Sequence, residues 1–192
     1  MEILLIIIIS YLLGSIPFGF LLTKIFLKKD IRNIGSGNIG ATNALRTGNK
    51  TLGYFTLILD ISKAIIPILI IKNYFQEYIY ISGLSVFLGH IFAIWLKLKG
   101  GKGVATYVGI LFCINYLIGL FFIIIWFILY LIFKFSSLSS LIASLSIPIF
   151  YFYYFEDQNY YFYIIMFILI FFTHRENIKR LINKTESKTK IY

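Results

Sequence analysis

Long apolar runs separated by short polar segments make up most of this chain. The runs 116–133 and 160–172 contain no charged residue. About 20 apolar residues in a helix cross a bilayer core of about 30 Å, because each residue adds about 1.5 Å. A segment in lipid must also satisfy its own backbone hydrogen bonds, which a helix does. The pattern therefore predicts an all-α integral membrane protein.

We expect about seven transmembrane helices, some of them short or broken. The first is interrupted by the sequence Gly14-Ser15-Ile16-Pro17. The run 104–133 would make about 45 Å of helix, which is too long for one upright span. A break near Asn115 would divide it into a half-length helix and a full one, although one steeply tilted helix also fits. The expected spans are about 3–26, 51–71, 78–96, two within 104–133, 139–154 and 160–172.

The distribution of basic residues favours two helices in 104–133. With seven spans, 16 of the 18 Lys and Arg fall on one face, whereas a single span there would move seven of them to the other face. Basic residues collect on the cytoplasmic side of membrane proteins. We therefore predict an external N-terminus and a cytoplasmic C-terminus. The cytoplasmic segments would be 24–50, 97–102, 134–137 and 174–192.

Composition narrows the class further. The chain is 59% hydrophobic and 14% charged, which excludes a water-soluble globule. In a soluble protein the net charge of +10 would suggest nucleic acid, but here it indicates membrane orientation and anionic ligands. The single cysteine, Cys113, excludes an intramolecular disulfide and a thiolate metal site. The first run lacks a basic start and a small-residue cleavage site, so we expect a retained span in one domain, 1–192.

The first polar cluster is the segment 32–46. It combines three Asn, three Gly and two Arg in fifteen residues. Glycines allow consecutive N–H groups to converge on an anion, and the arginine fork matches a phosphate. An ordinary flexible loop is the alternative interpretation.

The second cluster, 97–106, follows Gly89-His90 and contains the sequence KLKGGKG. It opens a helix, where free N–H groups and the helix dipole add to the lysine charge. It is not a nucleotide-binding Walker loop, because Leu96 and Gly103 stand where that motif needs Gly and Ser or Thr. A basic loop that only anchors to anionic lipid is the alternative.

The third cluster begins at the end of the last span. His174 and Asn177 are three residues apart and therefore share a helix face. His174 is either a base or an interfacial structural residue. The serine pair 136–137 would ordinarily cap a helix, and His90 is expected to be a hydrogen-bonded residue inside the membrane. Asp60 and Lys63, at i and i+3 within a span, should pair, with either a structural or a site role.

Three phosphate-suited clusters predicted on one membrane face suggest a ligand with one or two phosphates. The apolar interior beside them could take an acyl chain. No residue pattern suggests covalent catalysis, a metal site or a cofactor. A transporter for a phosphorylated metabolite is the competing class, but its polar groups should lie near the midplane or on both faces.

Five segments together resemble the bacterial acyl-phosphate:glycerol-3-phosphate acyltransferase family (PlsY). The resemblance implies acyl transfer from acyl phosphate to the 1-hydroxyl of sn-glycerol 3-phosphate, giving lysophosphatidic acid and phosphate at the cytoplasmic face of the plasma membrane. It implies no cofactor, and membrane lipids but no nucleic acid as partners. The matching segments are GSIPFG (14–19), GSGNIGATNALRTGNK (35–50), GHIFAIWLKLKGGKGVAT (89–106), SSLSS (136–140) and HRENIKRL (174–181).

The resemblance also implies site residues. Glu186 looks like the family's tail glutamate, but Lys184 stands where the family usually has glycine, which leaves the role of Glu186 open. The attacking hydroxyl could lose its proton to His174 or to a substrate phosphate, and the sequence does not choose between them. The implied catalytic residues are Ser137, His174 and Asn177, and the implied substrate-binding residues are Ser36, Asn38, Asn43, Arg46, Lys99, Gly101, Lys102 and Gly103.

Overall fold

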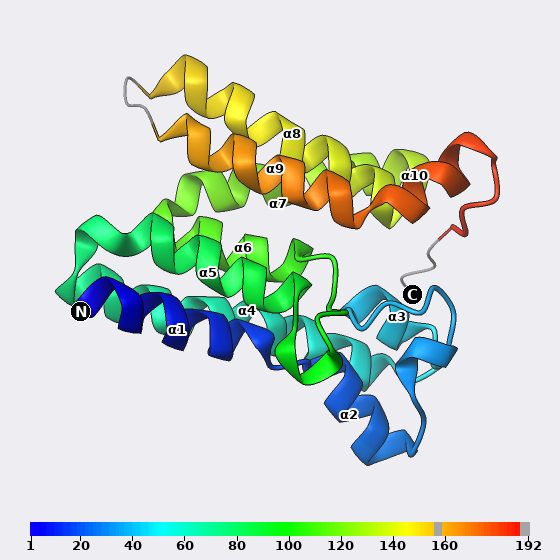
Figure 1. Cartoon of the computed structure of the whole chain (residues 1–192). Coiled ribbons are helices and arrows are strands. Elements are labelled where there is room, and N and C mark those ends of the chain that lie inside the picture. Colours follow the sequence, from blue (N-terminus) through cyan, green and yellow to red (C-terminus); the bar gives the residue numbers. More distant parts are fainter. Residues whose placement is uncertain (156–158, 189–192) are drawn as a thin grey trace. The chain divides into compact units, whose positions relative to one another are not determined.

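The computed structural model describes residues 1–155 and 159–188, and this part of the chain is helical without strands. The chain forms two compact units, Met1–Ile114 and Asn115–Tyr192. Figure 1 labels the helices of both units. The first unit holds α1 (Glu2–Ser15), α2 (Phe18–Leu27), η1 (Ile31–Asn33), α3 (Ala41–Leu45), α4 (Lys50–Tyr74), η2 (Gln76–Tyr78), α5 (Ile79–Ile91), η3 (Ile94–Leu96) and α6 (Val104–Ile114). The second holds α7 (Tyr116–Phe133), α8 (Ser136–Tyr154), α9 (Tyr160–Thr173) and α10 (Arg175–Ile182).

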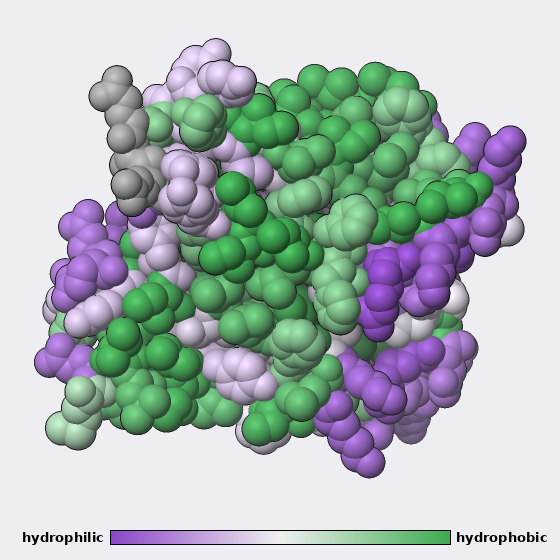
Figure 2. All heavy atoms as spheres, turned by 45° about the horizontal axis from the view of Figure 1, so that its top comes forward, coloured by the Kyte–Doolittle hydropathy of each residue, from purple (hydrophilic) through white to green (hydrophobic). Residues whose placement is uncertain are grey.

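The apolar helices confirm the prediction of an all-α integral membrane protein. Five helical segments of the described chain are long and apolar enough to cross a membrane, and α6 and α9 are shorter apolar helices. Large apolar side chains such as Ile124, Phe127 and Leu131 on α7 are exposed, as expected for contact with lipid. Figure 2 shows hydrophobic side chains covering most of the helical surface in view. The five long segments are Glu2–Leu27, Lys50–Tyr74, Gln76–Leu96, Tyr116–Phe133 and Ser136–Tyr154.

The run 104–133 contains two helices, which rules out a single tilted one. Asn115 lies between α6 and α7 with an extended backbone, φ −151° and ψ 116°. Its side-chain oxygen accepts a hydrogen bond of 2.9 Å from the Leu117 amide and so caps the first turn of α7. The charge distribution predicted two helices here, and the break falls at Asn115, as expected.

Small residues bring α1 and α5 into close contact. A Cβ added to Gly14 would meet the backbone oxygen of Val86, and one added to Gly89 would meet that of Tyr11. The Oγ atoms of Ser10 and Ser82 lie 2.9 Å apart between the same helices. Close backbone approach and interhelical polar contacts are the usual means of packing helices in lipid.

Two buried charges of α4 support the break between α1 and α2. The Lys63 ammonium lies 2.9 Å from Asp60 Oδ1, and both side chains are at most 3% exposed. Lys63 Nζ also donates a 2.8 Å hydrogen bond to the carbonyl of Ile16, just before Pro17. The same carbonyl accepts a 3.2 Å hydrogen bond from the Phe18 amide, so it is satisfied at the break by two donors outside the regular helical ladder. The predicted pairing of Asp60 and Lys63 is confirmed, and the hydrogen bond to Ile16 supports a structural role, while a role at the site stays a prediction.

In the second unit α8 packs against both α7 and α9, and α10 contacts α8 and α9. Trp126 of α7 donates a 2.9 Å hydrogen bond from Nε1 to Ser140 Oγ of α8. The rings of Tyr151 and Tyr163 join α8 to α9 with centroids 4.6 Å apart. The first contact holds the start of α8, which carries Ser137, and the second joins the end of α8 to the start of α9.

Candidate active site

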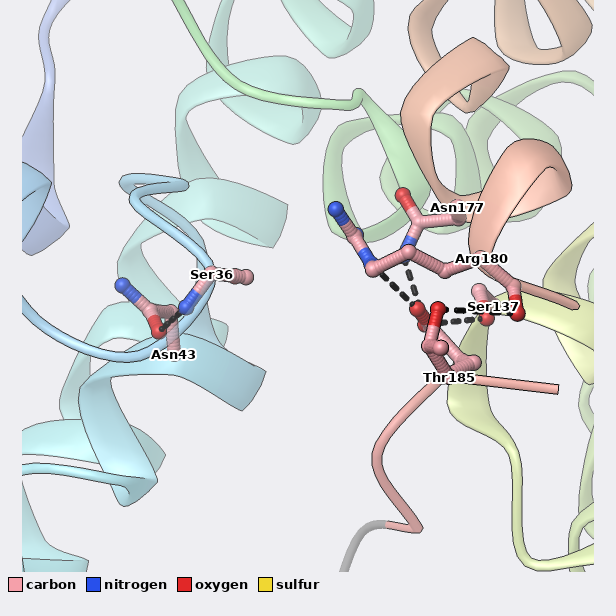
Figure 3. Close-up of polar contacts among 7 residues, drawn as sticks. Ser36, Asn43, Ser137, Asn177, Arg180 and Thr185 are labelled. Carbon is pink, nitrogen blue, oxygen red and sulfur yellow. Dashed lines mark hydrogen bonds and ion pairs between the residues drawn. The ribbon is translucent and has the colours of Figure 1, made fainter. Parts of the chain in front are cut away.

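Polar residues form one cluster in each unit, and the cluster of the first unit is organised by Asn43 of α3. The Asn43 side chain is 1% exposed. Its Oδ1 accepts a 2.9 Å hydrogen bond from the Ser36 amide, while Nδ2 lies 2.9 Å and 2.8 Å from the carbonyl oxygens of Ile34 and Asn38. Figure 3 shows the Ser36–Asn43 contact. All these partners are backbone groups, so the side chain of Asn43 holds the loop in shape.

Glycines allow the first loop to fold closely around Asn43 and Arg46. Gly35 and Gly37 have φ of 56° and 72°, a left-handed backbone that glycine adopts without strain. A Cβ on Gly35 would meet Asn43 Oδ1 and lie 2.8 Å from Cδ of Arg46. Ser36 is exposed between these glycines, but its amide is engaged by Asn43 and is not the open anion donor that a nest requires.

The two arginines of the first cluster differ in their surroundings. Arg32 binds Asp30 through two nitrogens, with an Nη2–Oδ2 distance of 2.6 Å, and these hydrogen bonds lower the pKa of Asp30 to about 2. Arg46 ends α3 and is half-buried against the loop. Arg46 is therefore the better candidate for binding an anionic substrate.

The first and second predicted clusters share a small apolar core within the first unit. Ile31, Ile39 and Ala44 from the first loop pack with Ala93 and Leu96, which precede the second. All five side chains are buried, and Phe20 of α2 packs against them. The core therefore brings the segment with Arg46 together with the segment that leads to Lys102.

The glycines of the second loop are required by packing against α5. The amides of Gly100 and Gly101 donate hydrogen bonds of 3.1 Å and 3.0 Å to the carbonyls of Ile91 and His90, the last residues of α5. A Cβ on Gly101 would meet the His90 ring, and one on Gly103 (φ 87°) would meet the Phe87 ring. These glycines thus cap α5 and leave no space for a side chain, a role that the sequence analysis did not predict.

The two lysines of this loop are placed differently. Lys102 is half-buried two residues before α6 begins at Val104, close to the positive end of the helix dipole, and Lys99 is exposed. Lys102 is therefore the better candidate of the two for binding an anion.

In the second unit, three donors converge on the carboxylate of Glu186. Ser137 Oγ and Asn177 Nδ2 donate to Oε1 at 2.7 Å and 2.6 Å, and Arg180 Nε donates to Oε2 at 2.6 Å. Figure 3 shows Ser137, Asn177 and Arg180 around this group. Burial alone would raise the pKa of Glu186, but the hydrogen bonds from Arg180, Ser137 and Asn177 outweigh burial and lower it.

This contact corrects the expected role of the serine pair. No side chain caps the first turn of α8, which begins at Ser136, because the N-cap residue is Phe135. Ser137 is buried and donates to Glu186 instead. The interpretation of these serines as helix caps is therefore wrong.

Lys184 makes the turn for which the family usually has glycine. Its φ is 57°, in the left-handed region. The amides of Thr185 and Glu186 then donate hydrogen bonds of 2.8 Å and 3.1 Å to the Arg180 carbonyl at the end of α10. Lysine tolerates this conformation at a modest cost, so the substitution does not prevent Glu186 from reaching Ser137 and Asn177.

His174 lies at the junction of α9 and α10 and is 2% exposed. Its Nδ1 is 2.8 Å from the carbonyl oxygen of Ile170. A carbonyl only accepts hydrogen bonds, so Nδ1 carries the hydrogen, and in the neutral ring the lone pair is on Nε2. This tautomer is the one that a general base needs.

Arg180 is a residue of this cluster that the sequence analysis missed. Its spacing was the available signal, because residues 174, 177 and 180 recur every three positions along one helix face.

Asn177 Oδ1 is buried without a hydrogen-bond partner in the described part of the chain. Within residues 1–155 and 159–188, no group of three His, Cys, Asp or Glu could hold a metal ion.

The chain is similar to glycerol-3-phosphate acyltransferases over nearly its whole length. The model of the family described as glycerol-3-phosphate acyltransferase matches residues 4–184. The glycerol-3-phosphate acyltransferase of Pelagibacter ubique is 69% identical over 192 residues and covers 100% of both chains. That of Mesorhizobium japonicum is 46% identical over 181 residues, covering 94% of this chain and 93% of the relative.

Two solved structures are similar to the whole chain. The glycerol 3-phosphate form of PlsY, an integral membrane glycerol 3-phosphate acyltransferase, has a TM-score of 0.94 at 36% identity and covers 99% of this chain and 96% of that chain. Its lysophosphatidic acid form has a TM-score of 0.90, also at 36% identity, covering 98% and 95%.

Proposed function

Since the chain belongs to the glycerol-3-phosphate acyltransferase family, we propose that it moves a fatty acyl group from acyl phosphate to the 1-hydroxyl of sn-glycerol 3-phosphate. The observation that carries the proposal is the match of the family model to residues 4–184. The chain is therefore an acyltransferase and a multi-pass membrane protein, which favours the enzyme over the transporter considered above. The products would be lysophosphatidic acid and inorganic phosphate.

The reaction needs charge stabilisation more than covalent chemistry. An acyl phosphate is a mixed anhydride, so the acceptor oxygen attacks its carbonyl carbon and the C–O bond to phosphate breaks. Negative charge develops on the carbonyl oxygen and on the departing phosphate. Arg46 and Lys102, the half-buried cations of the first unit, are suited to stabilise that charge and to hold the substrate phosphates. Binding both substrates together supplies proximity.

The second unit is suited to receive the acceptor hydroxyl. His174 directs its Nδ1–H to the Ile170 carbonyl, so its Nε2 lone pair can accept the hydroxyl proton. Asn177 has its amide nitrogen engaged by Glu186, which leaves Oδ1 to accept a hydrogen bond from the acceptor. We assign Ser137 to positioning, because its hydroxyl is also bound to Glu186. The roles of Ser36, Asn38, Lys99, Gly101 and Gly103 toward substrate remain predictions.

We further propose that the enzyme lies in the plasma membrane with its site at the cytoplasmic face. The support is the gathering of 16 of the 18 Lys and Arg in segments that seven spans would place on one side. The N-terminus would then be external and the C-terminus cytoplasmic. One family model covers residues of both compact units, which supports their acting as a single transmembrane acyltransferase domain over 1–192.

Purified protein in detergent tests the reaction directly. Palmitoyl phosphate is supplied with and without glycerol 3-phosphate, and phosphate and lysophosphatidic acid are both measured. We expect equal amounts of the two products, and only when glycerol 3-phosphate is present. In one control reaction, glycerol replaces glycerol 3-phosphate as the acceptor. In the other, palmitoyl-CoA replaces palmitoyl phosphate as the donor. Phosphate release without acceptor, or acylation from palmitoyl-CoA alone, would contradict the proposed reaction.

A further inference from the structure

His90 lies between the buried ion pair of α4 and the glycine loop that leads to Lys102. The side chain is 3% exposed, and its Nδ1 is 3.8 Å from Asp60 Oδ1. The opposite edge of the ring lies against Gly101, where a Cβ would meet Nε2 and come within 2.8 Å of Cε1. The imidazole therefore fills the space between the carboxylate and the loop.

The carboxylate that faces His90 is itself held in place. Asp60 is paired with Lys63 at 2.9 Å, and Lys63 is tied to the Ile16 carbonyl at 2.8 Å. Within the described residues, His90 Nδ1 is buried without a hydrogen-bond partner, which corrects the expectation of a satisfied histidine. The Asp60 carboxylate, 3.8 Å away, attracts a hydrogen carried on Nδ1, and this attraction favours one ring orientation.

The backbone of the same residue holds the other side of the loop. The carbonyls of His90 and Ile91, at the end of α5, accept the amide hydrogens of Gly101 and Gly100. The ring and the carbonyl of His90 thus both contact Gly101, the residue directly before Lys102. An error of about 1 Å in the position of a binding group can cost about a hundredfold in rate, so this support matters for chemistry.

We propose that His90, oriented by Asp60 and Lys63, is a positioning residue that sets the place of Lys102 for a phosphate-bearing substrate. It touches no substrate and acts through the loop 100–103. The inference rests on the proposed function, because it assumes that Lys102 binds substrate phosphate.

A double-mutant cycle between His90 and Gly101 tests the contact. In G101A the new Cβ meets only ring atoms of His90 among its three nearest neighbours, so we expect kcat/KM for glycerol 3-phosphate to fall about tenfold or more. H90A removes those atoms, and the double variant H90A/G101A should be more active than G101A alone. Contacting residues are expected to show such non-additivity. A normally active G101A, or a double variant no better than G101A, would overturn the proposal.

A second series separates positioning from folding. The amide nitrogen of asparagine can replace Nδ1, so H90N should keep a donor toward Asp60, whereas H90L keeps bulk without one. We expect H90L to raise KM for a phosphate-bearing substrate about fivefold or more above the wild-type value. The KM of H90N should lie between those of wild type and H90L. The control is S85A on the same helix, which removes a part-buried 2.8 Å hydrogen bond to the Ile81 carbonyl and should change the melting temperature without changing KM. Equal KM values for H90L and S85A in folded protein would refute positioning.

The variant K102A distinguishes failure of this inference from failure of the proposed function. If wild type forms no lysophosphatidic acid, the proposed function fails. If wild type is active and K102A leaves KM unchanged for both glycerol 3-phosphate and acyl phosphate, Lys102 does not bind substrate phosphate, so this inference fails while the proposed function stands. If K102A raises KM while H90L does not, the proposed function stands and the positioning role of His90 is refuted.

Discussion

Replacing Glu186 by glutamine should loosen the segment 174–188 from α8. The wild-type carboxylate accepts three hydrogen bonds of 2.6–2.7 Å. Glutamine can still accept from Ser137 and Asn177 through its oxygen, but its amide nitrogen would then face Arg180 Nε, a donor against a donor. A hydrogen bond to a charged group contributes about 1.5–3 kcal/mol. The Arg180 side chain is 35% exposed and can turn to water, so we expect a loss of about 2 kcal/mol.

The melting temperature of the detergent-solubilised protein measures this loss. For a chain of 150–250 residues, 1 kcal/mol shifts the midpoint by about 2–4 °C, so E186Q should melt about 4–8 °C lower. The matched control is E176Q, because Glu176 pairs with Lys179 at 3.4 Å on the exposed face of α10, within the same segment 174–188. Exposed pairs contribute at most about 1 kcal/mol. Equal midpoints for E186Q and E176Q would refute the reasoning.

The same pair of variants predicts a pH dependence. The pKa of Glu186 is lowered from 4.5 in the folded protein by its three donors, after burial is overcome. A group with a depressed folded pKa contributes its stability fully above its unfolded pKa and loses it as pH falls through the folded pKa. The difference in melting temperature between wild type and E186Q should therefore be constant near pH 7 and shrink below about pH 4.5. A difference that grows on acidification would contradict this sign.

The remaining predictions concern catalysis and topology. R46A should lower kcat/KM about tenfold or more, equivalent to ~1.4 kcal/mol. R46K should recover only part of that activity, because an ammonium lacks the bidentate fork of the guanidinium. Near-normal activity of R46A in folded protein would remove Arg46 from the site. H174A should lose the acidic limb of the kcat/KM–pH profile, measured where chemistry is rate-limiting, whereas a persisting limb would assign the proton to a substrate phosphate. A cysteine placed at position 188 on a Cys113→Ser background should react with an impermeant reagent only after cells are permeabilised, and labelling of intact cells would refute the cytoplasmic C-terminus.

Features that repeat along the chain could be predicted from the sequence. Hydrophobic length and the distribution of basic residues predicted the helical class and the division of 104–133 into two helices, because both depend on the bilayer rather than on particular neighbours. The i, i+3 spacing of Asp60 and Lys63 predicted their pairing, since both lie on one helix. The hydrogen bond from Lys63 to Ile16 joins residues 47 positions apart, and no local pattern indicates it.

For the glycines and serines of the candidate site, the sequence does not predict which groups they contact. A glycine indicates that something lies close to the backbone, but its neighbour can be a ligand, a helix end or a ring. At Gly101 that neighbour is the ring and carbonyl of His90, which belong to a different helix. At Ser137 the partner is Glu186, 49 residues away and two residues after the left-handed turn at Lys184. The motifs therefore indicated which segments carry clustered polar residues, whereas the contacts of each residue within them depend on tertiary structure that the spacing does not encode.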